Sequence, residues 1–220
     1  METSTSFGSV AVIDSQNQWV MREFTSDRRH NSVLFSPLQE LLESKINSQI
    51  ECVIVGSGPG SYSGTRVGIA AAQGVAIVAN CPAVAVPSIL AVPSAELGAT
   101  CLAIGDARRG SFWTARMDQY DLACGPEIMD ENEFQSIVAK AAAAGIPIFS
   151  FEESSRFPLA TELRQQVRLE FPCAKRLWQA WKSTSQSTRD EWLNIPAQPM
   201  YLKPPHITPA KRPWLITTPT

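Results

Sequence analysis

The chain has few of the side chains that hold transition metals in proteins. It contains only two histidines among 220 residues, His30 and His206, and these lie far apart in the sequence. Its five cysteines are odd in number and widely spaced, and no two of them form a Cys-x-x-Cys pair. Protein zinc sites need histidine, cysteine or carboxylate ligands at short spacings. The sequence therefore predicts no metal site, and it predicts that the cysteines are small core residues in a reducing compartment.

The chain also lacks a basic excess and any long uninterrupted apolar run. Its formal net charge is -2, its pI is about 5.8, and only 18% of its residues are charged. Proteins that bind nucleic acid alone use clustered Lys and Arg, so we expect any RNA contact to be shared with a partner. The apolar stretch Val67–Ala79 is interrupted by Gln73 and is too short to span a membrane, and no signal peptide is visible. We expect a cytoplasmic globular protein.

The most informative segment is 51–79. A β-rich run at 51–56 leads into a glycine-rich stretch at 57–66, which opens onto a helix-like stretch at 67–79. Glycine permits backbone angles that other residues avoid, and a helix start offers N–H groups to an anion. The loop lacks both the Gly-Lys-Ser/Thr ending of a P-loop and the spacing of a dinucleotide fingerprint. A phosphate-binding ancestry and a plain tight turn are therefore both open.

Small side chains recur on one face of the helix behind this loop. Gly64, Gly68, Ala71 and Val75 follow one another at spacings of four, three and four. An internal glycine such as Gly68 or Gly74 costs about 1 kcal/mol relative to alanine, so its presence indicates close packing. That packing is either against a second helix or against the protein's own sheet.

The segment Gly58-Pro-Gly-Ser-Tyr-Ser-Gly-Thr-Arg-Val-Gly68 resembles the signature of the TsaB (YeaZ) family. Members of this family are small subunits of the bacterial machinery that makes threonylcarbamoyladenosine in tRNA. Further agreement appears in the same order along nearly the whole chain, at Glu2-Thr-Ser-Thr5 with Ser9-Val-Ala-Val12, at His30-Asn-Ser32, at Ile104-Gly-Asp-Ala-Arg108 with Gly110, and at Pro199-Met-Tyr-Leu-Lys203.

The resemblance implies an α/β fold of the actin-like ATPase (ASKHA) type, in which two lobes with mixed β-sheets are flanked by helices. We expect an N-terminal lobe at 1–98 with the Gly-rich loop and the partner helices, and a C-terminal lobe at 99–195. A Pro-rich extended tail is expected at 196–220, which contains seven of the sixteen prolines.

The family pattern places an apolar half-strand before Glu2–Thr5, and here only Met1 stands there. The first strand is therefore expected to be truncated. A shortened central strand leaves backbone N–H and C=O groups of its neighbours unpaired. We expect either a native start upstream of Met1 or a weakened first lobe.

Local patterns place the other elements. Ser9–Ile13 and Trp19–Phe24 predict one hairpin, and Cys101–Gly105 with Ser111–Met117 predict another. The helix within 30–44 either begins early with Pro37 inside it, as the family pattern favours, or begins with Ser36 as its cap. Another helix is expected to begin within Val86–Leu90. Further along, we expect a helix that Asp130 caps at its start and Gly145 at its end, then a strand at Ile146–Phe151 and helices within 159–193.

The resemblance also implies a subunit without catalytic residues. In active relatives the first hairpin turn holds phosphate, and in this chain the corresponding phosphate-loop remnant consists of Thr3, Ser4, Gly58, Gly60 and Ser61. The catalytic paralogue TsaD carries a pair of metal-binding histidines that this chain lacks. We therefore expect no cofactor on the chain alone, and ATP and metal on the partner subunits.

The partners that the resemblance implies are a TsaD-like catalytic paralogue and a TsaE-like ATPase, with tRNA contacted only through the complex. Paralogues in such families meet through two helices of the first lobe, and self-association through the same face is an open alternative. The predicted interface residues are Val33, Leu34 and Leu41 from one helix and Arg66, Gly68, Ala71 and Val75 from the other. Core packing is the rival explanation for each.

The alternative function is a small actin-fold kinase or ATPase that acts alone. Such an enzyme needs a positioned acid in its cleft, and Asp106, between a strand and a turn, is the nearest candidate. The competing role for Asp106 is to organise the hairpin turn through local hydrogen bonds.

Overall fold

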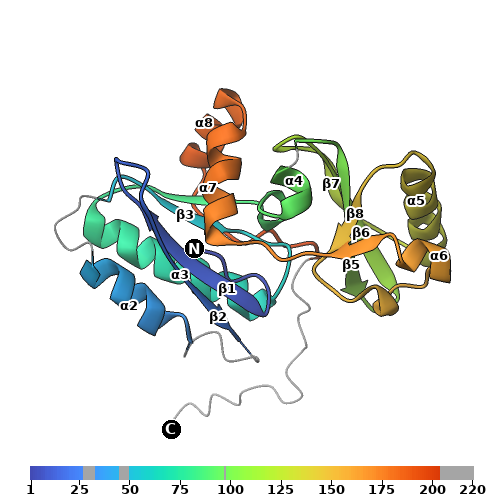
Figure 1. Ribbon diagram of the computed structural model, residues 1–220, viewed down its shortest axis with the longest axis horizontal. Helices are drawn as coiled ribbons and strands as arrows, with labels where there is room; N and C mark the ends of the chain where they lie inside the picture. The colour runs from blue at the N-terminus through green and yellow to red at the C-terminus, as the bar shows by residue number, and fades with distance from the viewer. Residues whose placement is uncertain (27–32, 45–49, 97, 204–220) are drawn as a thin grey trace, which may run out of the picture.

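The computed structural model describes residues 1–26, 33–44, 50–96 and 98–203. The chain forms two lobes that lie side by side (Figure 1), the first containing strands β1 to β4 and the second strands β5 to β9. In the described part of the chain, no helix combines the length and the apolar character needed to cross a membrane. His30 and His206 lie outside the described residues.

The first lobe opens with the predicted hairpin. Strands β1 (Phe7–Ile13) and β2 (Trp19–Thr25) pair antiparallel. The Asp14 carboxylate closes the turn, because its Oδ1 accepts hydrogen bonds from the backbone N–H groups of Gln16 and Gln18 at 3.0 and 2.9 Å. Asparagine tolerates the left-handed conformation that the turn requires at Asn17 (φ 59°).

The predicted strand, turn and helix at 51–79 are confirmed. Strand β3 (Val53–Gly56) leads to helix α3 (Tyr62–Ala79), which returns to strand β4 (Ala83–Val86), parallel to β3. The Ser61 side chain caps the helix by accepting from the N–H of Gly64 at 3.2 Å. At the other end, Asn80 takes the left-handed conformation that terminates many helices.

Helix α2 (Phe35–Ser44) lies beside α3 in the first lobe (Figure 1). Pro37 is its third residue, so the helix begins early and Ser36 does not act as its cap. Its inner face is buried against β1 and α3, in a cluster that contains Val10, Leu34, Leu38, Leu41 and Ala71.

Residues Met1 and Glu2 connect the two small sheets of this lobe. Glu2 and Ser9 form an antiparallel bridge with N···O distances of 2.8 and 2.9 Å. On the other side, the Met1 carbonyl accepts from the N–H of Gly56 at 3.0 Å. These two residues thus fill the position between β1 and β3. The weakened first lobe stays a prediction.

The second lobe contains a five-stranded mixed sheet in the order β7-β6-β5-β8-β9. Its strands are β5 (Cys101–Arg108), β6 (Ser111–Asp118), β7 (Asp121–Met129), β8 (Ile148–Ser150) and β9 (Val167–Leu169). Strands β5 to β7 are antiparallel, whereas β8 and β9 run parallel to β5. Helix α5 (Glu131–Ala143), with Asp130 as its cap as predicted, packs on this sheet beside the short helix α6 (Thr161–Arg164).

Two strands of this sheet were missed by the sequence analysis. Strand β7 contains Gly125 and Pro126, which normally argue against a strand, but a proline is tolerated on an edge strand. Strand β9 has only three residues and lies within a segment that was predicted to be helical. The helix expected near 86–90 is reduced to two short turns, η1 (Ser88–Leu90) and α4 (Pro93–Glu96), and a third short turn is η2 (Ser154–Arg156).

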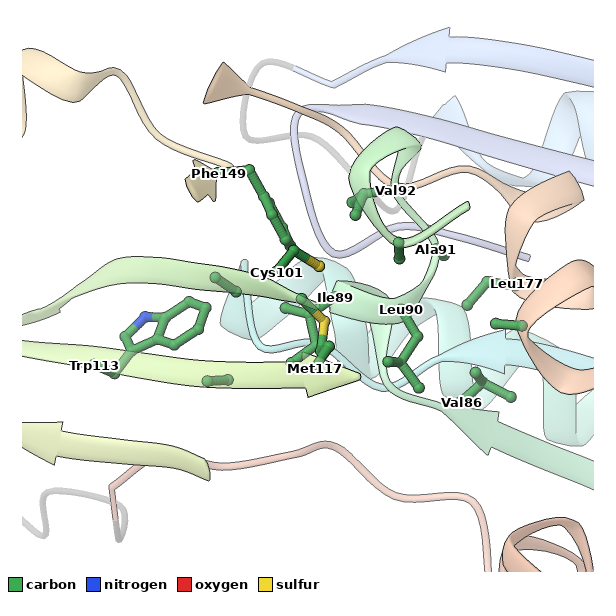
Figure 2. Close-up of a cluster of buried hydrophobic side chains, with 14 of the residues drawn as sticks. Val86, Ile89, Leu90, Ala91, Val92, Cys101, Trp113, Met117, Phe149 and Leu177 are labelled. Carbon is green, nitrogen blue, oxygen red and sulfur yellow. The ribbon is translucent and has the colours of Figure 1, made fainter. Parts of the chain in front are cut away.

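The chain returns to the first lobe before its end. Helix α7 (Ala174–Ser183) contacts β1 and β3, and α8 (Gln186–Asn194) contacts β4. These helices belong to the 99–195 segment that the sequence assigned to the second lobe. The central core therefore draws on both lobes: in Figure 2, Val86 from β4, Trp113 and Met117 from β6, Phe149 from β8 and Leu177 from α7 lie around one interior.

A buried carboxylate fixes the point where the chain crosses between the lobes. Glu170 follows β9, and its Oε2 and Oε1 accept hydrogen bonds from the Ser94 backbone N–H at 2.9 Å and from the Ser94 hydroxyl at 2.5 Å. Three residues later, the Cys173 N–H donates to the Ala91 carbonyl at 3.2 Å. A buried carboxylate is tolerated only with such partners.

We expect Ser94→Ala to lower the free energy of unfolding by about 1–3 kcal/mol, because it leaves a buried Glu170 oxygen without its hydroxyl donor. Urea denaturation of the purified protein measures this loss. The control is Ser136→Ala at an exposed position of α5, which should have little effect. Equal stability of the two variants would show that the Glu170 contact does not hold the crossover.

Candidate functional site

A cleft of about 1290 Å³ lies between the lobes. Its first-lobe wall contains the segment after Thr3, from Ser4 to Phe7, and the start of α3. Its second-lobe wall contains the end of β5, including Asp106, and the chain after β8, including Glu152. Ser4, Gly60 and Ser61 of the phosphate-loop remnant and the candidate acid Asp106 therefore line the same cleft, whereas Thr3 and Gly58 do not line it.

The structure places Ser4 of the remnant against Ser61 and places Thr3 against the first turn of α3. The Ser61 N–H donates to the Ser4 carbonyl at 2.6 Å. The Thr3 hydroxyl donates to the Gly64 carbonyl at 2.8 Å. An N–H at a helix start is the group that a phosphate oxygen would use. In this chain, the N–H of Ser61 already has a backbone carbonyl as its partner.

The glycines of this region are explained by the same close approach. A Cβ at Gly56 would overlap the Glu2 carboxylate, and a Cβ at Gly60 would overlap the Ser4 carbonyl. One at Gly68 would overlap the Thr3 hydroxyl. Each glycine thus accommodates one residue of the segment 2–4. Of the two alternatives for the loop, the geometry favours a tight packed turn.

The fifth remnant residue, Gly58, has a role of its own. It adopts a φ of 90°, which glycine accepts and other residues rarely do. Its N–H donates to the Ser88 hydroxyl at 3.0 Å, which ties the loop to the segment after β4.

Two buried oxygens of the segment 2–4 have no hydrogen-bond partner among the described residues. Glu2 is fully buried, and its Oε1 accepts from the Ser4 N–H at 2.6 Å, while its Oε2 has no such donor. The Ser4 hydroxyl is the second unpartnered group. Buried polar atoms normally have hydrogen-bond partners. These two oxygens are therefore the atoms of this segment that could still form hydrogen bonds with a bound molecule.

The carboxylates on the opposite wall are engaged by arginines and by backbone groups. Asp106 Oδ1 accepts from the Arg108 N–H at 2.6 Å, and its Oδ2 lies 3.1 Å from Arg108 Nη1. Glu152 Oε2 accepts from the Asp106 N–H at 2.8 Å, and its Oε1 lies 3.3 Å from Arg156 Nη1. Asp106 therefore organises its hairpin turn, the competing role that the sequence analysis left open.

Cysteine and metal chemistry have little support in the described residues. Residues 1–26, 33–44, 50–96 and 98–203 contain no group of three or more His, Cys, Asp or Glu side chains placed to hold a metal. Burial raises the pKa of Cys52 to about 11 and that of Cys101 to about 12. Both thiols are therefore protonated at neutral pH. The prediction that the cysteines are core residues is confirmed for Cys101 and is wrong for Cys124, which is exposed on strand β7; the other three are half-buried.

The predicted partner residues divide by exposure. Arg66 is exposed, and Val33 and Val75 are half-buried. Leu34, Leu41, Gly68 and Ala71 are buried within this chain. For these four, core packing is the explanation that the structure supports, because α2 packs its leucines on Ala71 and Thr3 packs on Gly68.

The sequence analysis missed an exposed face of the same helix, which we term the outer stripe of α3. Its residues recur every four positions along the helix: Tyr62, Arg66, Ala70, Gly74 and Val78. Val78 is 88% exposed and its neighbour Ile77 is 80% exposed. Phe35 of α2 is also more than half exposed. The four-residue spacing of this face is visible in the sequence, beside the spacing of Gly64, Gly68, Ala71 and Val75 on the other face.

Comparisons with known proteins agree with this architecture. The family model described as TsaD, tRNA N6-adenosine threonylcarbamoyltransferase, matches residues 23–167. The tRNA threonylcarbamoyladenosine biosynthesis protein TsaB of Escherichia coli (strain K12) is 28% identical over 183 residues, which cover 77% of this chain and 69% of that protein. This chain belongs to the TsaD family, in its TsaB (YeaZ) group.

Other relatives support the same placement and the fold. The TsaB protein of Haemophilus influenzae is 31% identical over 98 residues, 43% of this chain and 41% of that protein. Two solved structures, YeaZ from Pseudomonas aeruginosa and a protein from that organism similar to peptidase YEAZ, superpose with TM-scores of 0.66 and 0.67 at 21% and 20% identity. They cover 91% and 92% of this chain, and this chain covers 97% of each. The fold is the two-lobed actin-like ASKHA fold that the resemblance implied.

Two glycines of α3 give a matched test of the remnant geometry. We expect Gly68→Ala to destabilise the protein by about 1–3 kcal/mol, because its methyl group would overlap Thr3. Gly74→Ala should stabilise it by up to about 1 kcal/mol, since no atom lies within 4 Å of the added Cβ. Chemical denaturation measures both. A Gly68→Ala protein as stable as Gly74→Ala would contradict the packed-turn interpretation.

Proposed function

We propose that this TsaB-group chain is a non-catalytic subunit that binds a TsaD-type catalytic paralogue through the outer stripe of α3 and the neighbouring exposed face of α2. In that assembly it supports threonylcarbamoyl transfer to the adenosine beside the tRNA anticodon. The observation that carries the proposal is the outer stripe itself, which is apolar, exposed and built around a glycine.

Gly74 is the feature that distinguishes this surface from an ordinary exposed helix face. An exposed helical glycine weakens the isolated helix, and no atom of the described residues approaches the place where its Cβ would lie. Gly68, the other glycine in the interior of α3, has a similar cost in helix stability, and its presence is explained by the close approach of Thr3. A partner helix that packs closely over Gly74 and Ala70 would explain the remaining one, because small residues let helices approach.

The flanks of the stripe fit an interface of this kind. Val78 and Ile77 provide large exposed apolar groups at one end. At the other end Arg66 stacks over the Tyr62 ring, with 4.8 Å between the guanidinium carbon and the ring centre. Aromatic residues and arginine are over-represented among the residues that dominate interface energy.

The cleft supports the non-catalytic part of the proposal. The anion-binding N–H of Ser61 is already paired with Ser4, and Asp106 and Glu152 are engaged by arginines. We therefore assign ATP and metal to the partner subunits, a TsaD-type protein and a TsaE-type ATPase. The net charge of -2 fits an RNA contact that is shared with these partners. In this role the chain works in the cytoplasm.

We expect Val78→Arg to abolish capture of a TsaD-type paralogue in a pull-down while leaving the circular dichroism spectrum and the melting temperature unchanged. The added charge would be buried without a partner at the interface but solvated in the free chain. Ile128→Arg is the matched control, because Ile128 is an exposed apolar residue of the second lobe. Ala71→Arg should lose both fold and binding, because Ala71 is buried beneath α2.

Full binding by Val78→Arg would remove the outer stripe from the interface. The alternative of self-association is resolved in the same samples by analytical ultracentrifugation of the isolated protein. If Val78→Arg also converts a dimer to a monomer, the two associations use the same face.

We further expect the isolated protein to release no phosphate from ATP above background and to retain no stoichiometric transition metal. A malachite-green assay and metal analysis of the purified protein test this. Turnover that disappears in Asp106→Ala would reverse the assignment and favour the stand-alone ATPase, because Asp106 is the candidate acid in the cleft.

A further inference from the structure

The chain does not leave the molecule after its last helix. Residues 197–203, which we term the C-terminal strap, form neither helix nor strand but run along the first lobe and reach the second. Five of these residues, 199–203, line the interlobe cleft. The strap therefore forms part of the cleft wall.

The strap is anchored to the first lobe by two hydrogen bonds. The Gln73 side-chain amide, from the middle of α3, donates to the Ala197 carbonyl at 2.9 Å. The Met200 N–H donates to the Ser57 carbonyl, directly after β3, at 2.8 Å. Ala197 is buried in the cluster that β3 and α3 form, so this end is held by packing as well.

The other end of the strap is attached to the central core and to the second lobe. Leu202 packs against the cluster that contains Trp113 of β6 and Phe149 of β8. The ammonium group of Lys203 donates to the Arg108 carbonyl at 3.2 Å, at the end of β5. Between the two ends, Tyr201 contacts Tyr62 at the start of α3, with ring centres 5.8 Å apart.

We propose that the C-terminal strap is a clasp that sets how far the interlobe cleft opens. The two lobes share the central core, so the relative motion open to them is a hinge about that core, and a contact on the cleft side limits how far such a hinge opens. The strap supplies that contact on the cleft side, whereas the Glu170 crossover fastens another point of the junction. Detaching Leu202 and Lys203 would remove the contacts that the described residues of the strap make with the second lobe, and the second lobe could then swing outward.

The clasp does not depend on the proposed partner. Its anchors are contacts within one chain, so it predicts a property of the isolated protein that can be measured before any partner is known. A failure of the binding experiments with Val78→Arg would therefore leave the clasp untouched, and the reverse also holds.

The test measures the distance between the lobes in the full-length protein. Spin labels are placed on ketone-bearing amino acids at Ser36 of α2 and Ser136 of α5, both exposed, so that the native cysteines stay unmodified. Pulsed electron paramagnetic resonance then gives the distance distribution. The release variant is Leu202→Asn with Lys203→Met, and the matched control is Leu193→Asn, an exposed leucine of α8.

We expect a longer and broader interlobe distance distribution in the release variant and a parent-like distribution in Leu193→Asn. Hydrogen exchange of the Met200 amide should accelerate by roughly tenfold or more in the release variant, because a strap without its contacts at residues 202 and 203 opens more often. An unchanged distance distribution overturns the proposal, whether the Met200 amide exchanges faster or not. If circular dichroism shows that the double variant is unfolded, the single variants Lys203→Met and Gln73→Met, each of which removes one anchor, replace it. The same interlobe distance distribution is then measured, and an unchanged distribution in both again overturns the proposal.

Discussion

The architecture of the first lobe depends on the contact between the segment 2–4 and the glycine face formed by β3, its loop and α3. Ser61 donates its N–H to Ser4, Thr3 donates its hydroxyl to Gly64, and Glu2 lies against Gly56. Side chains at these glycines would separate the segment from the helix. The same glycines that suggest a phosphate site in the sequence therefore serve, in the folded chain, to bring two backbone segments together.

This contact has a consequence for chemistry. A helix start binds an anion only if its N–H groups are available, and the Ser61 N–H is used by the Ser4 carbonyl. On the facing wall, Asp106 forms an ion pair with Arg108, and Glu152 forms one with Arg156. Several polar groups that line the cleft thus form hydrogen bonds with the protein's own chain. These contacts are consistent with the proposed role of the chain as a binding subunit.

Much of the fold was predictable because strong local signals agreed with the tertiary structure. The turn at Asp14, the cap at Asp130 and the strand before the Gly-rich loop all depend on contacts between residues a few positions apart, so the sequence alone indicates them. Strands β7 and β9 were not, because β7 contains a proline that only an edge position tolerates and β9 is too short to show a pattern. The return of α7 and α8 to the first lobe depends on long-range packing, which no local pattern specifies.

Helix α3 shows what periodicity in a sequence cannot decide. Helix α3 has small or apolar residues at four-residue spacing on two faces, one through Gly64 and Gly68 and the other through Ala70 and Gly74. Spacing identifies both faces equally well, since it reports which residues share a side of the helix and not what covers that side. The difference lies in residues far away in sequence: Thr3 covers Gly68, whereas none of the described residues approaches the Cβ position of Gly74. Gly68 is therefore explained by packing within the chain, whereas Gly74 is the glycine on which the proposed interface rests.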